Sequence, residues 1–273
     1  FGMRIAFIGG GNMATALIAG LAKELGAGAQ VHVVDPNPEA LDKMASQFGA
    51  TTATAIDTAV ASCEVVVLAV KPQQMRDVAA ALAPQLGAGP LVLSIAAGIR
   101  SADLARWLGG YGAIVRTMPN TPALIGMGIT GMVATSGVSE AQRAAADSVM
   151  RAVGKTVWLD SEELIDPVTA VSGSGPAYVF YFLEAMQAAA VEMGLSAEQG
   201  KALALATFAG AAELAAQSPE SLEVLRQRVT SKGGTTYAAI TSMEASGVKP
   251  AIMEAMKAAA ARGRELGEAL GKD

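Results

Sequence analysis

The side chains that most often carry chemistry are scarce in this chain, which has one histidine and one cysteine among its 273 residues. One of each, far apart in sequence, supports neither a metal cluster nor a nucleophile activated by histidine. Candidate chemistry therefore rests on three stretches rich in Gly, Ser and Thr, at residues 8–13, 171–176 and 230–236. Such stretches present backbone amides, which bind phosphates and carboxylates at helix starts. We expect an anionic ligand group at these stretches and no metal.

The first stretch has the spacing of a dinucleotide phosphate site. Gly9, Gly11 and Ala14 fit the pattern in which a tight turn brings the backbone against a pyrophosphate at a helix start. The alternative is a strand-to-helix turn that holds no ligand, because the pattern occurs in that role too. The predicted cofactor residues of this turn are Ile8, Gly9, Gly10, Gly11, Asn12 and Met13.

Two kinds of periodicity divide the chain near residue 160. Up to there, apolar runs of strand length alternate with helical segments, which predicts an α/β fold with a Rossmann-type doubly wound sheet. Beyond it every segment has a helical pattern, which predicts an all-α second domain. The expected domains are residues 1–160 and 161–273. The expected strands are 4–8, 31–34, 64–70, 91–95, 114–116, 129–134 and 156–159, and the expected second-domain helices are 162–171, 176–193, 197–217, 219–229 and 236–270.

Ligands of such sheets bind outside the carboxyl ends of the strands. Three further loops should therefore line one crevice with the glycine turn, where small residues leave room for a nicotinamide ring. Ordinary loop punctuation by Gly and Pro is the competing interpretation, and Lys71 either reaches a phosphate or is simply solvated. The predicted cofactor residues in these loops are Ala69, Val70, Lys71, Pro72, Ala96, Ala97, Gly98 and Asn120.

Asp35 stands at the end of the second expected strand. An acidic residue there usually accepts hydrogen bonds from the adenosine ribose and repels a 2′-phosphate, which favours NAD over NADP. A plain turn residue before Pro36 is the alternative. His32, within the strand, is expected to pack in the sheet and to have no catalytic role.

The other two Gly/Ser/Thr stretches each precede an expected helix. Their free amides would form a carboxylate site at a positive helix end, whereas a flexible interhelical turn is the alternative.

The expected helix 176–193 is apolar on most of its sides and must be covered on most of them. A second subunit is the simplest cover, so we expect a homodimer through the helical domain.

Composition argues against several classes of partner. A net charge of −5 with no basic cluster argues against nucleic acid and against a polybasic membrane anchor. The apolar segment 201–213 is shorter than the roughly 20 residues that span a bilayer. Cys63 is expected to be a buried, inert thiol, and we find no leader-like segment ahead of the first strand. These features favour a cytoplasmic protein with a small-molecule partner.

Five motifs, in this order along nearly the whole chain, resemble those of pyrroline-5-carboxylate reductase, and the last two together are highly specific. They are Ile8-Gly9-Gly10-Gly11-Asn12-Met13, Ala69-Val70-Lys71-Pro72-Gln73, Met118-Pro119-Asn120-Thr121-Pro122, Val171-Ser172-Gly173-Ser174-Gly175-Pro176-Ala177-Tyr178 and Thr230-Ser231-Lys232-Gly233-Gly234-Thr235-Thr236. The resemblance implies a cytoplasmic oxidoreductase of proline biosynthesis that reduces 1-pyrroline-5-carboxylate to proline with NAD(P)H. It also implies an interlocked helical homodimer, sometimes assembled further, in which the partner contributes to each active site.

The same resemblance implies the substrate site. The amides around Gly233, Gly234 and Thr235 would hold the substrate carboxylate, and the Thr236 hydroxyl would be the catalytic group, hydrogen-bonded to the ring nitrogen. A protonated cyclic imine is already an electrophile, so the protein has mainly to hold it within about 3–3.5 Å of the hydride donor. Asp166 would orient the neighbouring loop or lie on a helix surface. The implied substrate residues are Ser172, Gly173, Ser174, Gly175, Ser231, Gly233, Gly234, Thr235 and Thr236.

Asp35 departs from the pattern that the resemblance implies, because many NADPH-using relatives carry Ser, Asn or Arg there. We therefore predict NADPH as cofactor with NADH also usable. Two rival functions stay open. A β-hydroxyacid dehydrogenase would need an acid/base lysine, for which Lys201 is the only candidate early in the second domain. A dinucleotide-binding sensor dimer without turnover would need the glycine turn alone.

Overall fold

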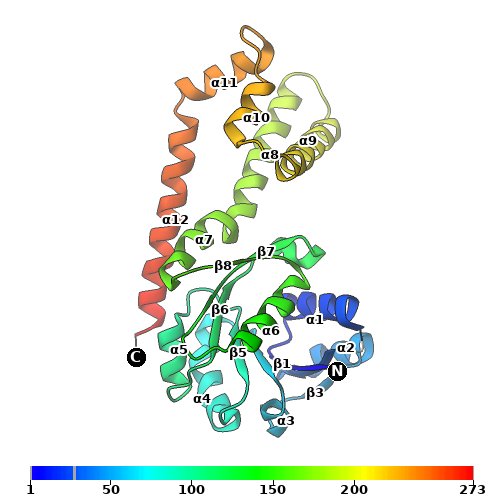
Figure 1. The fold of residues 1–273 in the computed structure, drawn as a ribbon. Helices are drawn as coiled ribbons and strands as arrows, with labels where there is room; N and C mark the ends of the chain where they lie inside the picture. Colours follow the sequence, from blue (N-terminus) through cyan, green and yellow to red (C-terminus); the bar gives the residue numbers. More distant parts are fainter. Residues whose placement is uncertain (1, 27–28, 273) are drawn as a thin grey trace. The chain divides into compact units, whose positions relative to one another are not determined.

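The computed structural model describes residues 2–26 and 29–272 (Figure 1). By its internal contacts the chain forms two compact units, residues 1–174 with 259–273, and residues 175–258. These units divide the chain differently from the expected domains, because the first helical turns after residue 160 and the end of the last helix pack on the sheet. As a division into functional domains, the boundary after residue 160 stays a prediction.

The first unit is built on a sheet that has eight strands within the described residues, in the order β3-β2-β1-β4-β5-β6-β7-β8. Neighbouring strands are parallel except β6 and β7, which are antiparallel. The predicted α/β fold with a Rossmann-type sheet is confirmed. The pattern did not predict β3, which has three residues and no apolar alternation. The strands are β1 (Met3–Ile8), β2 (Ala29–Val34), β3 (Thr51–Ala53), β4 (Val65–Leu68), β5 (Leu91–Ser94), β6 (Ile114–Met118), β7 (Gly128–Ala134) and β8 (Gly154–Trp158).

Helices pack on both faces of this sheet and form two apolar cores. Because side chains alternate along a strand, Phe7 of β1 enters one core with Leu17, while Ile8 enters the other with Leu82. Burying each large apolar side chain contributes about 1.5–3 kcal/mol to the stability of the fold. The ends of the strands are therefore held in place by a stable core. The helices of this unit are α1 (Asn12–Leu25), α2 (Pro38–Phe48), α3 (Thr58–Ala61), α4 (Met75–Leu86), α5 (Ser101–Trp107), α6 (Glu140–Arg151) and α7 (Ile165–Val168), with the 3₁₀ turns η2 (Pro72–Gln74), η3 (Thr121–Ile125) and η4 (Glu162–Leu164).

The Ser-Gly-Ser stretch that follows α7 is helical. Residues Thr169–Gly173 form a π-helix, η5, which is followed by Ser174 and then by α8 (Gly175–Glu192). The Ser174 amide donates to the Thr169 carbonyl at 2.8 Å, and the Ser172 hydroxyl donates to the Val168 carbonyl at 3.0 Å. The expectation of a turn with free amides here is wrong, because small residues fit a widened helix as readily as a turn. Single π-turns inside helices are frequent at functional sites.

The second unit consists of helices with little core of their own. Besides α8 it contains α9 (Ala197–Gln217), α10 (Leu222–Arg228), α11 (Thr235–Ala245) and the first part of α12 (Val248–Leu270). Phe182 and Phe208 join α8 to α9 by an edge contact of 5.4 Å between ring centroids. Among the described residues of this unit, the fully buried ones are Ala190, Gly200 and Ala204.

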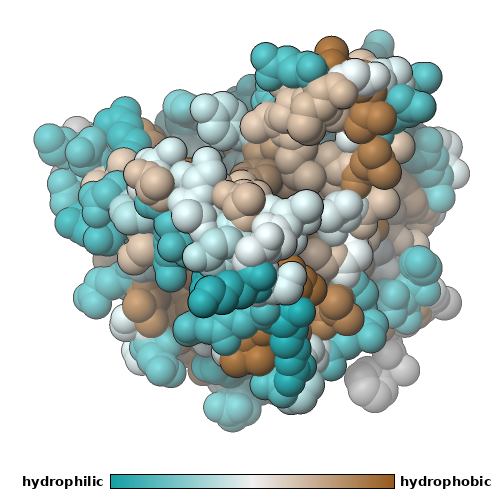
Figure 2. Space-filling model, turned by 90° about the horizontal axis from the view of Figure 1, so that it is seen from above, coloured by the Kyte–Doolittle hydropathy of each residue, from teal (hydrophilic) through white to brown (hydrophobic). Residues whose placement is uncertain are grey.

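Large apolar side chains of this unit stand exposed, as expected for a helix that is apolar on most sides. Figure 2, which views the molecule from above Figure 1, shows apolar residues in brown and tan at the surface. Tyr181 is 77% exposed and Met193 78% exposed. Soluble proteins rarely leave so many such residues uncovered, which indicates an interaction surface. The exposed large apolar residues of this unit include Val179, Phe180, Tyr181, Phe182, Val191, Met193, Leu195, Leu203, Leu205, Leu214, Leu222, Val229, Tyr237, Met243, Ile252 and Met253.

Candidate active site

The glycine turn joins β1 to α1 in a shape that requires glycine at its first position, Gly9. Gly9 has φ +107°, and its amide donates to the Val34 carbonyl at 2.8 Å. A Cβ added there would lie 2.5 Å from the Ala69 carbonyl oxygen. A Cβ added at Gly11, by contrast, would meet no atom of the described structure within 4 Å. Gly9 is thus required by the fold, whereas Gly11 borders open space at a helix start.

That helix start is free to bind an anion. The first i→i−4 bond of α1 runs from the Thr15 amide to the Gly11 carbonyl, so the amides of Asn12, Met13 and Ala14 have no helical acceptor. No side chain of the described residues caps this end. Exposed amides at a positive helix end suit a pyrophosphate.

Asp35 ties the glycine turn to the end of β2. Its Oδ2 accepts a hydrogen bond from the Gly10 amide and its Oδ1 one from the Asn37 amide, both at 2.8 Å. The interpretation of Asp35 as a turn residue is therefore confirmed. A carboxylate oxygen has more than one lone pair, so each can still accept a ribose hydroxyl, and that role stays a prediction.

The other predicted cofactor loops lie at the same edge of the sheet. Since β1, β4, β5 and β6 are parallel, their carboxyl ends meet there, and the Ala69 amide donates to the Ile8 carbonyl at 2.8 Å. Lys71 is exposed and precedes the η2 turn. Asn120 uses its Oδ1 to accept the Ile129 amide at 3.0 Å, which pins the loop after β6. The structure thus brings together every cofactor residue predicted in the first unit.

Two glycine contacts bring the Ser-Gly-Ser stretch to the same edge. A Cβ added at Gly131 of β7 would lie 2.8 Å from Val168, and one added at Gly173 would lie 2.7 Å from Met118 Cε. Helix α7 and the π-helix therefore pack closely across β6 and β7, which places Ser172 at the carboxyl end of β6. Met118 belongs to the third of the predicted motifs, whereas Gly131 was not predicted as a site residue. An isolated glycine inside a strand pattern, as at 131, signals such a close approach.

An ion pair between a buried arginine and a half-buried glutamate fixes the start of this helical segment. Arg116 of β6 is 6% exposed and donates from Nη1 to Glu162 Oε2 at 2.8 Å. The same carboxylate oxygen accepts the Ser101 amide at 2.8 Å. The Glu162 side chain is 32% exposed, so breaking this pair should cost less than the roughly 3–5 kcal/mol typical of a fully buried pair, but the contact still ties η4 to β6. Asp166 lies half-buried on α7 beside Gly263 of α12.

The stretch before α11 belongs to the second unit. Gly233 has φ +77°, and the Gly234 amide donates to the Ser231 carbonyl at 3.0 Å. The first i→i−4 bond of α11 runs from the Ala238 amide to Gly234, so the amides of Thr235 and Thr236 have no helical acceptor. The predicted helix start with free amides is confirmed, except that the Gly234 amide is engaged in its own turn. Thr236 is half-buried.

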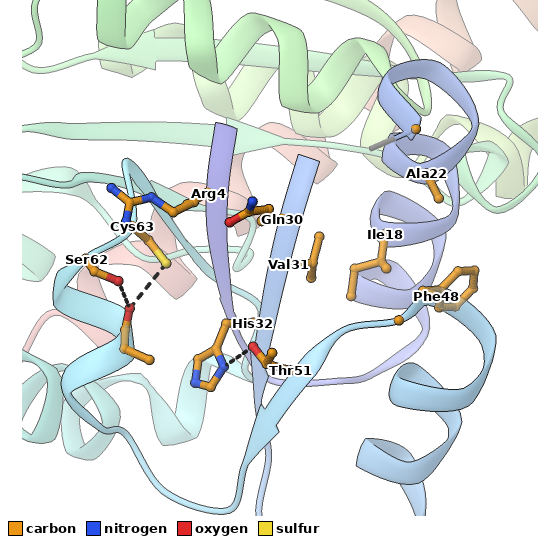
Figure 3. A pocket seen from close by; sticks show the side chains of 13 residues that line it. Arg4, Ile18, Ala22, Gln30, Val31, His32, Phe48, Thr51, Ser62 and Cys63 are labelled. Atoms are coloured by element: carbon orange, nitrogen blue, oxygen red, sulfur yellow. Dashed lines mark hydrogen bonds between the residues drawn. The ribbon is translucent and has the colours of Figure 1, made fainter. Parts of the chain in front are cut away.

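A cavity of about 440 Å³ lies at the opposite, amino-terminal edge of the sheet (Figure 3). His32 is buried in its wall, with Nδ1 2.8 Å from Thr51 Oγ1 and Nε2 3.1 Å from Asp57 Oδ1. Cys63 is buried as predicted, and burial raises the pKa of its thiol. These side chains stabilise the sheet far from the carboxyl edge, and the cavity forms no part of the candidate site.

Two searches of the described residues bear on other kinds of site. No group of three or more His, Cys, Asp or Glu side chains in that part of the chain could hold a metal ion. No helix there is both long enough and apolar enough to cross a membrane.

Comparison with known proteins assigns the family. The model "Pyrroline-5-carboxylate reductase dimerisation" matches residues 162–266, and "NADP oxidoreductase coenzyme F420-dependent" matches residues 4–98. Pyrroline-5-carboxylate reductase of Pseudomonas aeruginosa is 48% identical over 98% of both chains. The structure of the Coxiella burnetii enzyme is 39% identical, with a TM-score of 0.92 over 97% of this chain and 99% of that one. The Plasmodium falciparum enzyme, solved with NADP bound, is 28% identical with a TM-score of 0.83 over 97% and 98%. The chain belongs to the pyrroline-5-carboxylate reductase family, as its motifs led us to expect.

Proposed function

We propose that this chain reduces 1-pyrroline-5-carboxylate to L-proline, the last step of proline biosynthesis, with hydride from NAD(P)H. The observation that carries the proposal is similarity over the whole length, which includes both the sheet with its glycine turn and the helices with both Gly/Ser/Thr stretches. A rival that shares the sheet alone would leave the helical stretches unexplained.

The carboxyl edge of the sheet fits a dinucleotide. The space beside Gly11 is open at the amides of Asn12 and Met13, which have no helical acceptor, and a pyrophosphate would bind there. Asp35 lies at the adenosine side, and Ala69, Pro72, Gly98 and Asn120 border the nicotinamide side. When bound, the reduced nicotinamide supplies the hydride. The protein holds the ring and fixes the face that it presents.

The Gly/Ser/Thr stretches would hold the substrate. We assign the substrate carboxylate to the amides of Gly233 and Thr235 at the positive end of α11, and the pocket floor to Ser172, Gly173, Ser174 and Gly175. The Thr236 hydroxyl would hydrogen-bond the ring nitrogen of the imine and help to manage its proton. Ser231 shapes the turn by accepting the Gly234 amide.

For the cofactor we propose NADPH, with NADH also usable. A relative with NADP bound supports the first, and the carboxylate of Asp35 supports the second, since it can accept from a free 2′-hydroxyl and repels a 2′-phosphate.

For the assembly we propose a cytoplasmic homodimer through the helical domain, with no nucleic-acid or membrane partner and with room for a higher oligomer. The support is the match to a dimerisation family over residues 162–266 and the exposed apolar faces of α8 and α9.

The test is the absorbance of reduced nicotinamide when pyrroline-5-carboxylate is added to the purified protein and NADPH. Oxidation of the cofactor with formation of proline supports the proposal. Binding of NADPH without oxidation supports the sensor, and oxidation of β-hydroxyacids by NAD(P)+ in its place supports the dehydrogenase. In the latter case Lys201→Met should abolish turnover, whereas the reductase should tolerate this change of an exposed residue.

A further inference from the structure

The end of the chain packs against one of the predicted cofactor loops. Residues 259–273 belong to the first unit, and Figure 1 shows the end of α12 beside α5. A Cβ added at Gly98 would lie 3.0 Å from Leu270 Cδ1, and one added at Gly267 would lie 3.6 Å from the Gly98 carbonyl oxygen. Two glycines thus let the last turns of α12 approach the loop that follows β5.

The loop of Ala96, Ala97 and Gly98 is held by contacts at both ends, and Leu270 packs against it between them. The Ala96 amide donates to Ser94 Oγ at 3.3 Å, and Ile99 is 2% exposed in the core. Gly98, with φ +77°, has no side chain with which to fix itself. Leu270 packs against the same core cluster that contains Ala96 and Ile99. Its side chain therefore limits how far the loop can move outward.

Three arginines hold the end of α12 in this place. Arg100 donates to the Arg264 carbonyl at 3.3 Å, Arg106 to the Gly271 carbonyl at 2.9 Å and Arg76 to the Lys272 carbonyl at 3.0 Å. Arg106 and Arg76 bind carbonyls just after the last residue of α12, at the negative end of the helix dipole, whereas Arg100 binds a carbonyl one to two turns earlier. Arg100 lies two residues after Gly98, so one of the three arginines that hold α12 is on the same backbone segment as the loop.

We propose that Leu270 is a positioning residue for the dinucleotide, which acts by holding Gly98 and with it the loop of Ala96, Ala97 and Gly98 where the nicotinamide binds. This rests on the proposed function, because it takes that loop as part of the cofactor site. Leu270 lies beyond residues 162–266, which match the dimerisation family, and packs against a core of the sheet.

The test compares Leu270→Ala with Leu270→Met and with the matched control Leu266→Ala, one helical turn away on α12 and 42% exposed. The dissociation constant for NADPH is measured by nicotinamide fluorescence without substrate, and steady-state constants are measured with pyrroline-5-carboxylate. If the loop without Leu270 is correctly placed a tenth to a fifth of the time, the dissociation constant rises about five- to tenfold. Met should restore it, the control should not change it, and kcat at saturating NADPH should stay near that of the unmodified chain.

A merely structural role predicts something else. If Leu270→Ala lowered the melting temperature but left the dissociation constant for NADPH unchanged, the proposal would be overturned. Loss of kcat with unchanged NADPH affinity would overturn it as well. Failure of the unmodified chain to oxidise NADPH would count against the proposed function alone, because the binding measurement needs no turnover.

Discussion

The two outer glycines of the glycine turn should fail in different ways when each is replaced by alanine. At Gly9 a Cβ would lie 2.5 Å from the Ala69 carbonyl oxygen, on a residue with φ +107°. At Gly11 the backbone has φ −76° and ψ −168°, which alanine adopts readily, and a Cβ would meet no described atom within 4 Å. Gly9→Ala should therefore damage the fold, and Gly11→Ala should damage ligand binding alone.

The sizes of the two effects follow from these contacts. Left-handed backbone costs a non-glycine residue about 1–2 kcal/mol, and overpacking against the carbonyl of Ala69, the residue after β4, adds about 1–3 kcal/mol. For a unit of this size, that sum lowers the melting temperature by about 5–15 °C. At Gly11 the added methyl group occupies the space of a phosphate and costs roughly one charge-assisted hydrogen bond, about 1.5–3 kcal/mol. The affinity for NADPH should then fall about 10- to 100-fold.

Differential scanning fluorimetry and titration of NADPH by nicotinamide fluorescence measure the two quantities on the same samples. The expected result is a large thermal shift for Gly9→Ala and an unshifted melting temperature with weak NADPH binding for Gly11→Ala. If Gly11→Ala bound NADPH as tightly as the unmodified chain, the pyrophosphate would not sit at this helix start. If Gly9→Ala were as stable as the unmodified chain, the steric argument for the turn would be refuted.

Three further predictions concern single side chains. Asp35→Ser should raise kcat/KM with NADPH and lower it with NADH, because a carboxylate that repels the 2′-phosphate is lost; negligible turnover of the unmodified chain with NADH at saturation would contradict the role given to Asp35. Thr236→Ala should lower kcat far more than NADPH affinity while Thr236→Ser keeps most of it, and unchanged kinetics would remove Thr236 from the mechanism. Burial raises the pKa of the Asp147 carboxyl on α6, but hydrogen bonds to the carboxylate have a larger opposite effect, and the pKa lies below its usual value of 3.8. The donors are Thr156 at 2.7 Å, Trp158 at 2.9 Å and Arg151. The carboxylate therefore stabilises the fold above pH 3.8, and this contribution is lost as the pH falls further below that value. Acid unfolding of Asp147→Asn should accordingly depend less on pH below 3.8, and an unaltered acid transition would refute the assignment.

Local sterics and strand order explain why the glycine turn and the loops beside it were predictable. The positive φ of Gly9 and its close approach to the Ala69 carbonyl require glycine at that position, and apolar runs such as Val65–Leu68 encode strands buried on both faces. The carboxyl ends of parallel strands lie at one edge of the sheet. The order of the strands along the chain was therefore enough to predict that Ala69, Gly98 and Asn120 lie at that edge.

The π-helix could not be read from the sequence in the same way. Ser, Gly and Ser at 172–174 suit a turn and a helix about equally, and the decision lies in packing against distant residues. Gly173 contacts Met118, and Val168 contacts Gly131. These residues are 37 or more positions apart in the sequence, so the local periodicity of side chains cannot predict the contacts. The support of Gly98 by Leu270 is hidden for the same reason, because a C-terminal helix pattern does not say which surface the helix reaches.

The division of labour in the chain follows from where these contacts fall. All predicted cofactor residues, together with Ser172, Gly173 and Ser174, lie in the first unit, where buried strands and the Arg116–Glu162 pair hold them rigidly. Thr235 and Thr236 lie in the second unit, whose helices bury little of their own apolar surface. A small helical unit of this kind gains stability chiefly by covering its exposed faces. If the proposed roles hold, the substrate residues at the start of α11 depend on assembly in a way that the proposed dinucleotide edge does not. The proposed hydride donor and substrate sites then draw on different sources of stability.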